Sequence, residues 1–425
     1  MGIENNKLRV LLVGSGGREH AIAWKLAQSL RLGELFVAPG NAGTAAVATN
    51  VDIAADDVEA LLKFVQDNNI DFTVVGPEAP LAKGIVDTFQ KAKHPIFGPS
   101  KNAARIETSK AFAKQLMQRN KIPTAPSKTF TDAEEALRHI NQGVFPLVVK
   151  ADGLAAGKGV IIARDRYEAN EAIRDCIERR IFGDAGNVVL VEEFLQGEEM
   201  SVFAFVDGER ISSMVAARDY KRVRDGDDGP NTGGMGSFSP PSKWNAELEA
   251  RVRREIMEPT VKALAKDKSS YRGVLYAGLM LTDKGPYVLE FNARMGDPET
   301  QAVLPRLKSD LLQIMLDTAR GDIANTRIEW DQRSCVAVVL ASGGYPGHYI
   351  INQAISGLDA VDDDVTVFHA GTRVVDGKVA TSGGRVLAVA ALGDTIADAR
   401  ARVYKNTSRI TFNQSFHRSD IAAGI

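Results

Sequence analysis

The chain has 425 residues, with 52 Lys and Arg against 54 Asp and Glu, and a formal net charge of −2. No apolar run approaches the roughly 18 residues of a membrane span, no secretory signal opens the chain, and two cysteines cannot form a disulfide framework. The near-zero charge argues against a protein that coats nucleic acid by bulk charge. We therefore expect a cytoplasmic protein of about three domains.

The first hundred residues alternate short apolar runs with segments of helical period. The pattern predicts strands at Leu8–Val13, Leu35–Ala38, Phe72–Val75 and Ile96–Phe97, and helices at Glu19–Leu30 and Val58–Asn68. Strands that alternate with helices indicate a parallel sheet with right-handed crossovers. Ligands bind at the carboxyl ends of the strands in such sheets.

The middle of the chain is richer in strands. Leu147–Lys150 and Val160–Ala163 enclose a glycine-rich segment with no helix behind it, which predicts a hairpin. Further strands are expected at Val188–Val191, Ser201–Val206, Leu275–Leu281 and Tyr287–Phe291, a long loop at Arg218–Pro241, and helices at Thr108–Asn120, Pro298–Pro305, Leu311–Ala319 and Asn245–Ile256, the last stopping or kinking at Pro259.

A new series of elements begins at about Arg333. It has predicted strands at Val336–Ala341 and Val386–Ala391 and a predicted helix at Thr395–Tyr404. The fold class is therefore a multi-domain mixture of α/β and α+β parts. We predict an N-terminal α/β domain at 1–106, a central body at 107–332 with a lobe at about 124–194, and a small mixed α/β domain at 333–425.

Glycines mark the first candidate site, Gly14-Ser15-Gly16-Gly17, at the end of the first strand. A dinucleotide fingerprint needs a third glycine where Glu19 stands, and no acidic residue ends a second strand about 20 residues further on. A tight turn into a helix still offers backbone amides to one phosphate monoester. The alternative is a plain strand–helix turn.

The segment Ala151–Gly159 is the second candidate. It is no P-loop, because Gly159 stands where Ser or Thr should bind Mg²⁺. Small residues between Lys150 and Lys158 are typical of a flap that closes on polyphosphate, with lysines that neutralise its charge. A hairpin with solvated lysines is the alternative.

The third candidate is the strand end Leu289-Glu290-Phe291-Asn292. Strand alternation puts Glu290 and Asn292 on one face, and two oxygen ligands with phosphate and water are how Mg²⁺ is usually held. Read alone, this stretch also fits a solvated strand end.

The basic run Arg218–Arg224 is a candidate nucleic-acid interface. Asp225, Asp227 and Asp228 follow it directly, however, and cancel its positive charge. With the glycine-rich Asn231–Gly236 behind it, the segment better fits a loop that binds a phosphorylated small molecule. The cysteines and the six histidines form no pattern for a nucleophile or for zinc.

Together these segments resemble the glycinamide ribonucleotide synthetase (phosphoribosylamine–glycine ligase) family of the ATP-grasp superfamily. The resemblance runs from about Val10 to Ile421 and rests on GSGGREHA, PGNAGT, VVGPEAPL, SKAFAK, VVKADGLAAGKGV, KRV-x-DGDDGPNTGGMG, EFN-x-R-x-GDPETQ, GGYPG, HAGT and GGRVLAV. It implies a Rossmann-like N-terminal sheet, an ATP-grasp body of two lobes and a C-terminal domain. It also implies ATP and Mg²⁺ (or Mn²⁺) as cofactors.

The resemblance assigns residues to four groups. Those implied for ATP are Lys110, Lys150, Gly153, Gly157, Lys158, Gly159, the adenine hinge Glu192, Glu193, Phe194 and Leu195, and Glu198 or Glu199 for the ribose. Those implied to be catalytic are Lys150 and the residues that line the pocket for glycine and the acyl phosphate, Asp219, Lys221, Arg222, Arg294 and Asp297, and the metal ligands are Glu290 and Asn292. Those implied for phosphoribosylamine are Gly14, Gly16, Gly17, Arg18, Asn41, Gly43, Thr44 and Glu78.

The implied reaction joins glycine to 5-phosphoribosylamine through glycyl phosphate, in purine biosynthesis. It needs positioning and charge neutralisation rather than a covalent intermediate. Glycine and phosphoribosylamine are the expected partners of a monomer that binds neither nucleic acid nor membrane. The alternatives are another ATP-grasp carboxylate–amine ligase, a dinucleotide-dependent oxidoreductase and a nucleic-acid-binding protein.

The chain departs from the family pattern at several positions. They are Arg218 and Tyr220 ahead of Lys221, Ala293 and Met295 around Arg294, and the final segment 420–425, which lacks Gly-Trp-Arg. We assign no role to these residues from the resemblance.

Overall fold

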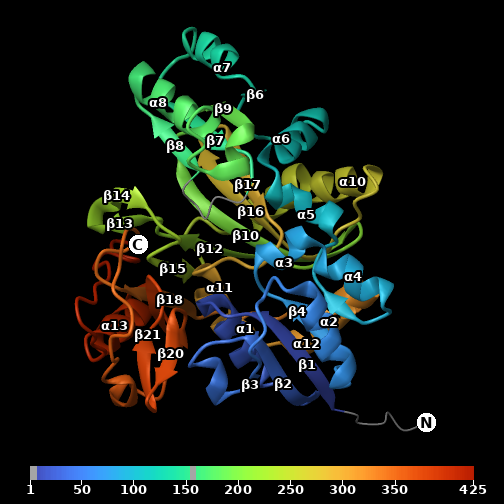
Figure 1. The fold of residues 1–425 in the computed structure, drawn as a ribbon, viewed down its shortest axis with the longest axis vertical. Helices are drawn as coiled ribbons and strands as arrows, with labels where there is room; N and C mark the ends of the chain where they lie inside the picture. Colours follow the sequence, from blue (N-terminus) through green and yellow to red (C-terminus); the bar gives the residue numbers. More distant parts are fainter. Residues whose placement is uncertain (1–6, 154–158) are drawn as a thin grey trace.

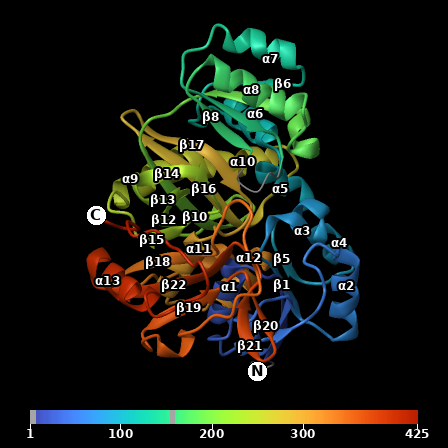
Figure 2. The same cartoon turned by 60° about the vertical axis from the view of Figure 1, so that its left-hand side comes forward.

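The structure, a computed structural model, describes residues 7–153 and 159–425. In Figures 1 and 2 a small lobe projects at one end, and the N- and C-terminal parts lie side by side at the other. No helix among the described residues is long and apolar enough to cross a membrane.

The N-terminal part is a parallel sheet with the order β3-β2-β1-β4-β5. Its strands are β1 (Leu8–Gly14), β2 (Leu32–Pro39), β3 (Thr49–Asn50), β4 (Phe72–Val75) and β5 (Ile96–Phe97), with helices α1 (Gly17–Leu26), α2 (Val58–Asp67), α3 (Glu78–Lys83), α4 (Ile85–Lys91) and α5 (Lys101–Thr108). Both faces of the sheet are covered, so β4 and most of β1 are buried, as their uninterrupted apolar runs predicted.

The small lobe follows helix α6 (Lys110–Arg119), which Ser109 caps by accepting from the Phe112 amide. Its antiparallel sheet has the order β6-β9-β7-β8, with β6 (Ser127–Phe130), β7 (Leu147–Ala151), β8 (Val160–Ala163) and β9 (Val189–Glu193), covered by α7 (Ala133–Ile140) and α8 (Arg166–Ile177). Residues such as Phe130, Val149 and Ile173 give the lobe a hydrophobic core of its own. The predicted hairpin is therefore present as β7 and β8.

The central sheet has the order β17-β16-β10-β12-β15-β18-β22-β19, with β11 beside β10. Its strands are β10 (Glu198–Asp207), β11 (Arg210–Ile211), β12 (Val215–Asp219), β15 (Gly236–Ser239), β16 (Arg272–Thr282), β17 (Gly285–Asn292), β18 (Ser334–Ala341), β19 (Val365–His369) and β22 (Arg385–Gly393). Because β15 pairs with β18, one sheet continues from the central body into the C-terminal part.

The remaining elements cover this sheet or form small hairpins at its edges. They are α9 (Ala246–Val252), α10 (Glu258–Lys266), α11 (Glu299–Val303), α12 (Leu311–Arg320) and α13 (Ile396–Thr407), and the hairpins β13 (Arg222–Arg224) with β14 (Asp228–Asn231) and β20 (Thr372–Val375) with β21 (Lys378–Thr381). The predicted multi-domain α/β and α+β fold class is confirmed.

Three predicted elements differ from the structure. The segment Arg218–Pro241 is mostly paired strand, because charged and glycine residues there sit in short hairpins rather than in a free loop. The helix after Asn245 passes Pro259 through a π-turn at Arg253–Met257, which places the proline in the first turn of α10, where its missing N–H costs little. Helix α1 ends at Leu26 rather than at Leu30, since the chain turns there, with the Ser29 amide donating to the Leu26 carbonyl at 2.9 Å, before β2 begins at Leu32.

Candidate active site

The glycine turn after β1 is filled by a side chain of the protein itself. Glu19 in the first turn of α1 accepts from the Gly16 amide at 2.6 Å and from Arg18 Nε at 2.5 Å. A Cβ on Gly14, Gly16 or Gly76 would lie within 2.8 Å of the Glu19 side chain. The glycines therefore make room for Glu19, and the Gly16 amide is already bonded.

The loop with Asn41, Gly43 and Thr44, also predicted to bind phosphoribosylamine, connects two parts of the chain. The Asn41 side chain accepts from the amides of Gly43 (2.8 Å) and Thr44 (3.0 Å). It donates to the carbonyls of Ser15 and of His369, both at 2.8 Å. Asn41 therefore ties the turn after β1 to the end of β19, and the amides of Gly43 and Thr44 are bonded within the loop.

Four charged side chains meet beside this turn, three from helices α1, α3 and α5 and one, Arg294, from the turn after β17. Glu78 at the start of α3 lies 3.3 Å from Arg294 Nε and 3.8 Å from Arg18 Nη1. Glu107 of α5 lies 2.7 Å from Arg294 Nη2 and also accepts from the Ala293 amide. Burial opposes ionisation of Glu78, but Arg294 and Arg18 prevail and lower its pKa to about 2.

Glu107 is a residue that the sequence analysis missed. Burial raises the pKa of its carboxyl, although Arg294 opposes this. Nothing in its surroundings in the sequence marks it, because its partner lies 187 positions away along the chain. Only the contact between α5 and β17 brings the two together.

The residues predicted to bind the nucleotide lie between α6 and the small lobe. Lys110 Nζ donates to the Gly153 carbonyl at 2.8 Å, so it lies at the start of the predicted flap. Gly159 closes the hairpin by accepting from the Ala151 amide at 2.9 Å. Gly157 and Lys158 lie outside the described residues.

Glu192 is shared by two lysines in the interior. Its Oε2 atom lies 2.9 Å from Lys150 Nζ and 3.1 Å from Lys114 Nζ. Its Oε1 atom is buried with no hydrogen-bond partner among the described residues. Glu193, Phe194 and Leu195, predicted to contact adenine, continue from Glu192 toward the surface, with Glu193 exposed.

A second ionic group lies where β10 meets β12 and β13. Glu199 pairs with Lys221, and Lys221 lies 3.7 Å from Asp219. Burial raises the pKa of Asp219 to about 7 against the opposing charge of Lys221. Glu198, the other residue predicted for the ribose, pairs instead with Arg218 at 3.3 Å and with Lys243 at 2.9 Å.

The proposed metal ligands end β17. A bulge at Leu289 leaves that residue without a partner on β16, and its carbonyl accepts from Lys150 Nζ at 3.1 Å. Glu290 follows, and although burial would raise the pKa of its carboxyl, the charges of Lys221, Lys150, Lys110 and Arg294 lower it. The charges of these four predicted cations therefore all favour the ionised form of this carboxylate.

Glu290 and Asn292 fit a hard divalent cation. One offers an ionised carboxylate and the other a buried amide oxygen, which are ligand types that Mg²⁺ and Mn²⁺ accept. No cluster of three or more His, Cys, Asp or Glu able to hold a metal occurs within 7–153 and 159–425. The protein would therefore supply few of the ligands, as suits a metal that arrives with a nucleotide.

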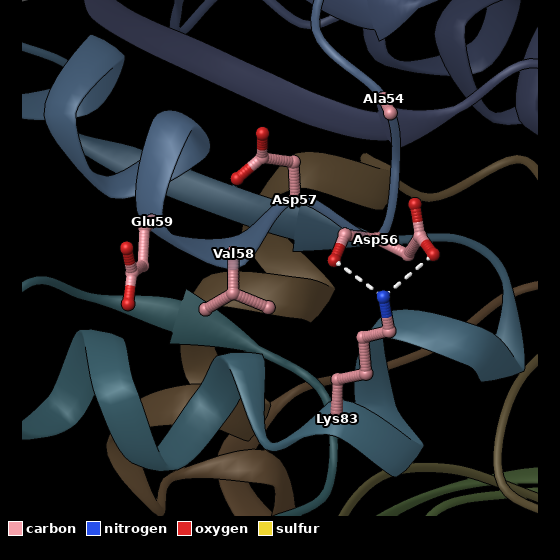
Figure 3. A pocket seen from close by; sticks show the side chains of 6 residues that line it. All are labelled: Ala54, Asp56, Asp57, Val58, Glu59 and Lys83. Carbon is pink, nitrogen blue, oxygen red and sulfur yellow. Dashed lines mark hydrogen bonds and ion pairs between the residues drawn. The ribbon is translucent and has the colours of Figure 1, made fainter.

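A hollow elsewhere on the N-terminal part contains none of these residues. It is lined by Ala54, Asp56, Asp57, Val58, Glu59 and Lys83 (Figure 3). Lys83 pairs with Asp56 at 2.7 Å, and Asp57 caps α2 by accepting from the Ala60 amide. Lys83, Asp56 and Asp57 thus already have partners within this part of the fold. We therefore take Glu290 and the charged residues near it, not this hollow, as the candidate site.

Family models match almost the whole chain. The N domain of phosphoribosylglycinamide synthetase matches residues 8–107, its ATP-grasp (A) domain residues 108–300, and its C domain residues 335–424. The chain belongs to the phosphoribosylglycinamide synthetase family. The predicted family and the enzyme class, an ATP-using ligase, are confirmed.

Individual relatives agree over their full length. A phosphoribosylamine–glycine ligase of Caldanaerobacter subterraneus is 50% identical over 98% of this chain and 100% of its own. One of Escherichia coli K12 is 49% identical over 97% of this chain and 98% of its own.

Solved structures show the same architecture. A phosphoribosylamine–glycine ligase of Thermotoga maritima has a TM-score of 0.86 and 35% identity, and the match covers 97% of this chain and 100% of that one. A biotin carboxylase domain of Hydrogenobacter thermophilus 2-oxoglutarate carboxylase has a TM-score of 0.74 at 14% identity over 96% of this chain and 91% of that one, a likeness of fold alone.

Proposed function

We propose that this chain joins glycine to 5-phosphoribosylamine through glycyl phosphate, with ATP converted to ADP and phosphate. The observation that carries the proposal is that Lys150 Nζ bonds the Leu289 carbonyl beside Glu290 at 3.1 Å, while the charges of Lys110, Lys150, Lys221 and Arg294 together lower the pKa of the Glu290 carboxyl. Such a set of cations neutralises the phosphates of ATP and an incoming carboxylate together. Family membership supplies the identity of the two substrates.

The activation step needs charge neutralisation more than a base. The carboxylate of glycine is already anionic, so its attack on the γ-phosphate is limited by repulsion and by orientation. Lys110, Lys150 and Arg294 offset that repulsion, while Asp219 and Lys221 line the glycine side. Magnesium or manganese on Glu290 and Asn292, when bound, supplies further neutralisation of the phosphate oxygens.

The amine of phosphoribosylamine then attacks the carbonyl carbon of glycyl phosphate and releases phosphate. We assign the phosphoribosylamine side to the glycine turn with Arg18 and Glu78, which lie beside Arg294. A Cβ on Gly16 would lie 3.5 Å from Asp297 Oδ2, so the turn and the acyl-phosphate pocket face each other. The two halves of the reaction can thus meet without transfer of an intermediate across the molecule.

We propose in addition that the protein acts as a monomer in the cytoplasm and binds neither nucleic acid nor membrane. Both cysteines are free and buried, which fits a reducing compartment. The basic run is neutralised within the fold, since Arg218 pairs with Glu198, Lys221 with Glu199, and Arg224 with Asp228. Little of its charge is left for phosphates of a nucleic acid.

The test is ADP release with ATP, Mg²⁺, glycine and freshly generated phosphoribosylamine, with each substrate omitted in turn. We expect full turnover only in the complete mixture, and formation of glycinamide ribonucleotide equal to ADP. ADP formation at full rate without glycine would instead indicate another ATP-grasp ligase. Replacement of Mg²⁺ by Mn²⁺ in the same assay tests the choice of metal.

A further inference from the structure

The glycine-rich segment Thr232–Gly236 does not offer its amides to a ligand. The Thr232 amide donates to the Lys221 carbonyl at 2.7 Å, and the Met235 amide to the Tyr220 carbonyl at 2.8 Å. The Gly234 amide donates to Thr232 Oγ1 at 2.9 Å. The amides of Thr232, Gly234 and Met235 are therefore already bonded within the protein and are not free to bind a phosphate. The glycines of this segment need another explanation.

That explanation is a side chain from the C-terminal domain. Arg385, the first residue of β22, donates from Nη1 to the Gly233 carbonyl at 2.7 Å and to the Asp297 carbonyl at 3.0 Å. Its Nη2 atom lies 3.2 Å from Asp297 Oδ2. A Cβ on Gly233 would lie 2.9 Å from Arg385 Cζ, so only glycine permits this approach.

A second residue of the same domain contacts the same segment. The Tyr345 hydroxyl accepts from the Gly233 amide at 2.9 Å. Tyr345 itself packs over Gly384, where a Cβ would lie 2.3 Å from its ring. Arg385 and Tyr345 therefore bind the carbonyl and the amide of one glycine, and both come from beyond the ATP-grasp domain.

Asp297 is surrounded by several charges, but Arg385 is the one that contacts its carboxylate. Arg18 and Arg294 also attract Asp297, while Gln301 of α11 donates to its Oδ1 at 2.9 Å. Arg18 is bonded to Glu19 and Arg294 to Glu107. Among the described residues, the ion pair with Asp297 is the one that Arg385 makes.

We propose that Arg385, supported by Tyr345, is a positioning residue of the ligation, through which the C-terminal domain holds the Asp297 carboxylate and the Thr232–Gly236 segment in place. This inference rests on the proposed function. Asp297 faces Gly16 of the phosphoribosylamine side, so loss of Arg385 displaces a group between the two substrates. The lysines of the nucleotide side have their own contacts, with Glu192 and Gly153, and these do not include Arg385.

The test compares Arg385→Gln, Arg385→Lys and Tyr345→Phe with a control, Arg402→Gln. Arg402 lies on α13 of the same domain and pairs with Asp364 at the surface. For Arg385→Gln we expect KM for phosphoribosylamine and glycine to rise by about 10-fold or more and KM for ATP to change by less than about 2-fold. Arg385→Lys should recover part of the loss, because lysine keeps the charge but cannot span both Gly233 and Asp297.

Tyr345→Phe removes one hydroxyl and should raise the same two KM values by about 3-fold, and Arg402→Gln should change none. Unchanged KM values in all three site variants, or a loss confined to the fraction of folded protein, would overturn the inference. If Arg385→Gln does not fold, the KM values of Tyr345→Phe and Arg385→Lys are used to test the inference instead. Wild-type turnover that ignores phosphoribosylamine would overturn the proposed function instead, so the two failures are distinct.

Discussion

At the scale of single residues, the site depends on buried charges that share partners. Lys114 of α6, which the sequence analysis left unassigned, is bonded to Thr124 Oγ1 at 2.6 Å and paired with Glu192. Burial lowers the pKa of Lys114 to about 8 despite Glu192. Because Glu192 has Lys114 as a second partner, a movement of Lys150 toward a bound phosphate would not leave a buried carboxylate without an ion pair.

Replacement of Glu290 by glutamine tests the centre of the site. The change removes the negative charge that these four cations stabilise, while it keeps the shape of the side chain. We expect kcat/KM for ATP to fall by about 100-fold or more, since charge balance and the metal ligand are both lost. Steady-state ADP release at saturating Mg²⁺ measures it.

The matched control is Glu209→Gln, an exposed carboxyl in the turn after β10. It should leave turnover and thermal stability unchanged. Wild-type turnover of Glu290→Gln at high Mg²⁺ would refute the metal assignment.

A histidine pair joins the first helix to the C-terminal part. His20 Nδ1 accepts from the His369 amide at 2.7 Å, so the neutral ring is the form that fits. Burial and the neighbouring His369 lower the pKa of His20 to about 3, and burial lowers that of His369 to about 4. Protonation of His20 at Nδ1 would place the new N–H against the N–H of His369, so the hydrogen bond would be lost.

This pair predicts a loss of stability in weak acid. Below pH 6.5 the unfolded state binds more protons at both rings than the folded state, so the free energy of unfolding falls as pH falls toward 4. The two rings together should contribute about 2 kcal/mol of loss between pH 6.5 and 5.5. Urea unfolding at these two pH values measures it.

His20→Asn keeps an acceptor in place of Nδ1 but cannot titrate. It should remove about 1 kcal/mol of the difference between the two pH values. An identical pH dependence in this variant and in the wild type would contradict the role of His20.

At the scale of elements, two departures from the family pattern contact each other. The Tyr220 hydroxyl, between β12 and β13, accepts from the Ala422 amide in the C-terminal segment at 2.9 Å. Arg418 lies 4.9 Å over the Tyr220 ring and pairs with Asp227 of the β13–β14 hairpin at 2.8 Å. Asp420 of the altered segment also accepts from the Gly226 amide of this hairpin at 2.8 Å, so the chain from Arg418 onward anchors the hairpin beside Lys221.

Tyr220→Phe removes only the hydroxyl from this contact. It leaves the Ala422 amide without its acceptor, so we expect the free energy of unfolding to fall by about 1 kcal/mol. Chemical denaturation measures the change, and Tyr349→Phe, at a ring 41% exposed, is the control. Equal stability of Tyr220→Phe and wild type would show that the hydroxyl anchors nothing.

At the scale of the whole molecule, the small lobe is the part most separate in its packing. The other clusters combine distant segments, as where Leu11 of β1 shares a core with Val202 of β10. The lobe core draws only on residues from Phe130 to Val191. A smaller core buries less apolar area, so the lobe should open at a lower free energy than the central sheet.

The two cysteines report on this difference. Cys176 lies in the lobe core and Cys335 in β18 of the central sheet, and burial raises their thiol pKa values to about 11 and about 12. Neither should react in native buffer, because the thiolate is the reactive form. In moderate urea, Cys176 should be labelled about 10-fold faster than Cys335 in single-cysteine variants, and ATP should slow it. Equal labelling rates would mean that the lobe and the sheet open together.

Much of the architecture could be predicted from local patterns. Phe72–Val75 and Val160–Ala163 are strands with the predicted bounds, since apolar β-branched runs bounded by turns have few other structures. Arg218–Pro241 was mispredicted as loop for two reasons: its short β13–β14 hairpin consists largely of charged and glycine residues with no apolar strand pattern, and β15 pairs with β18, which lies far along the chain. No local signal records such pairing.

The order of residues alone is enough to assign the family, to locate the strand–turn motifs and to place the glycines within them. The role of those glycines becomes visible in the folded protein, where Gly16 makes room for Glu19 and Gly233 for Arg385, rather than each offering an amide to phosphate. A glycine in a motif shows only that a side chain would not fit at that position. The group that occupies the space is three positions away for Gly16 and 152 positions away for Gly233, so the motif does not identify it.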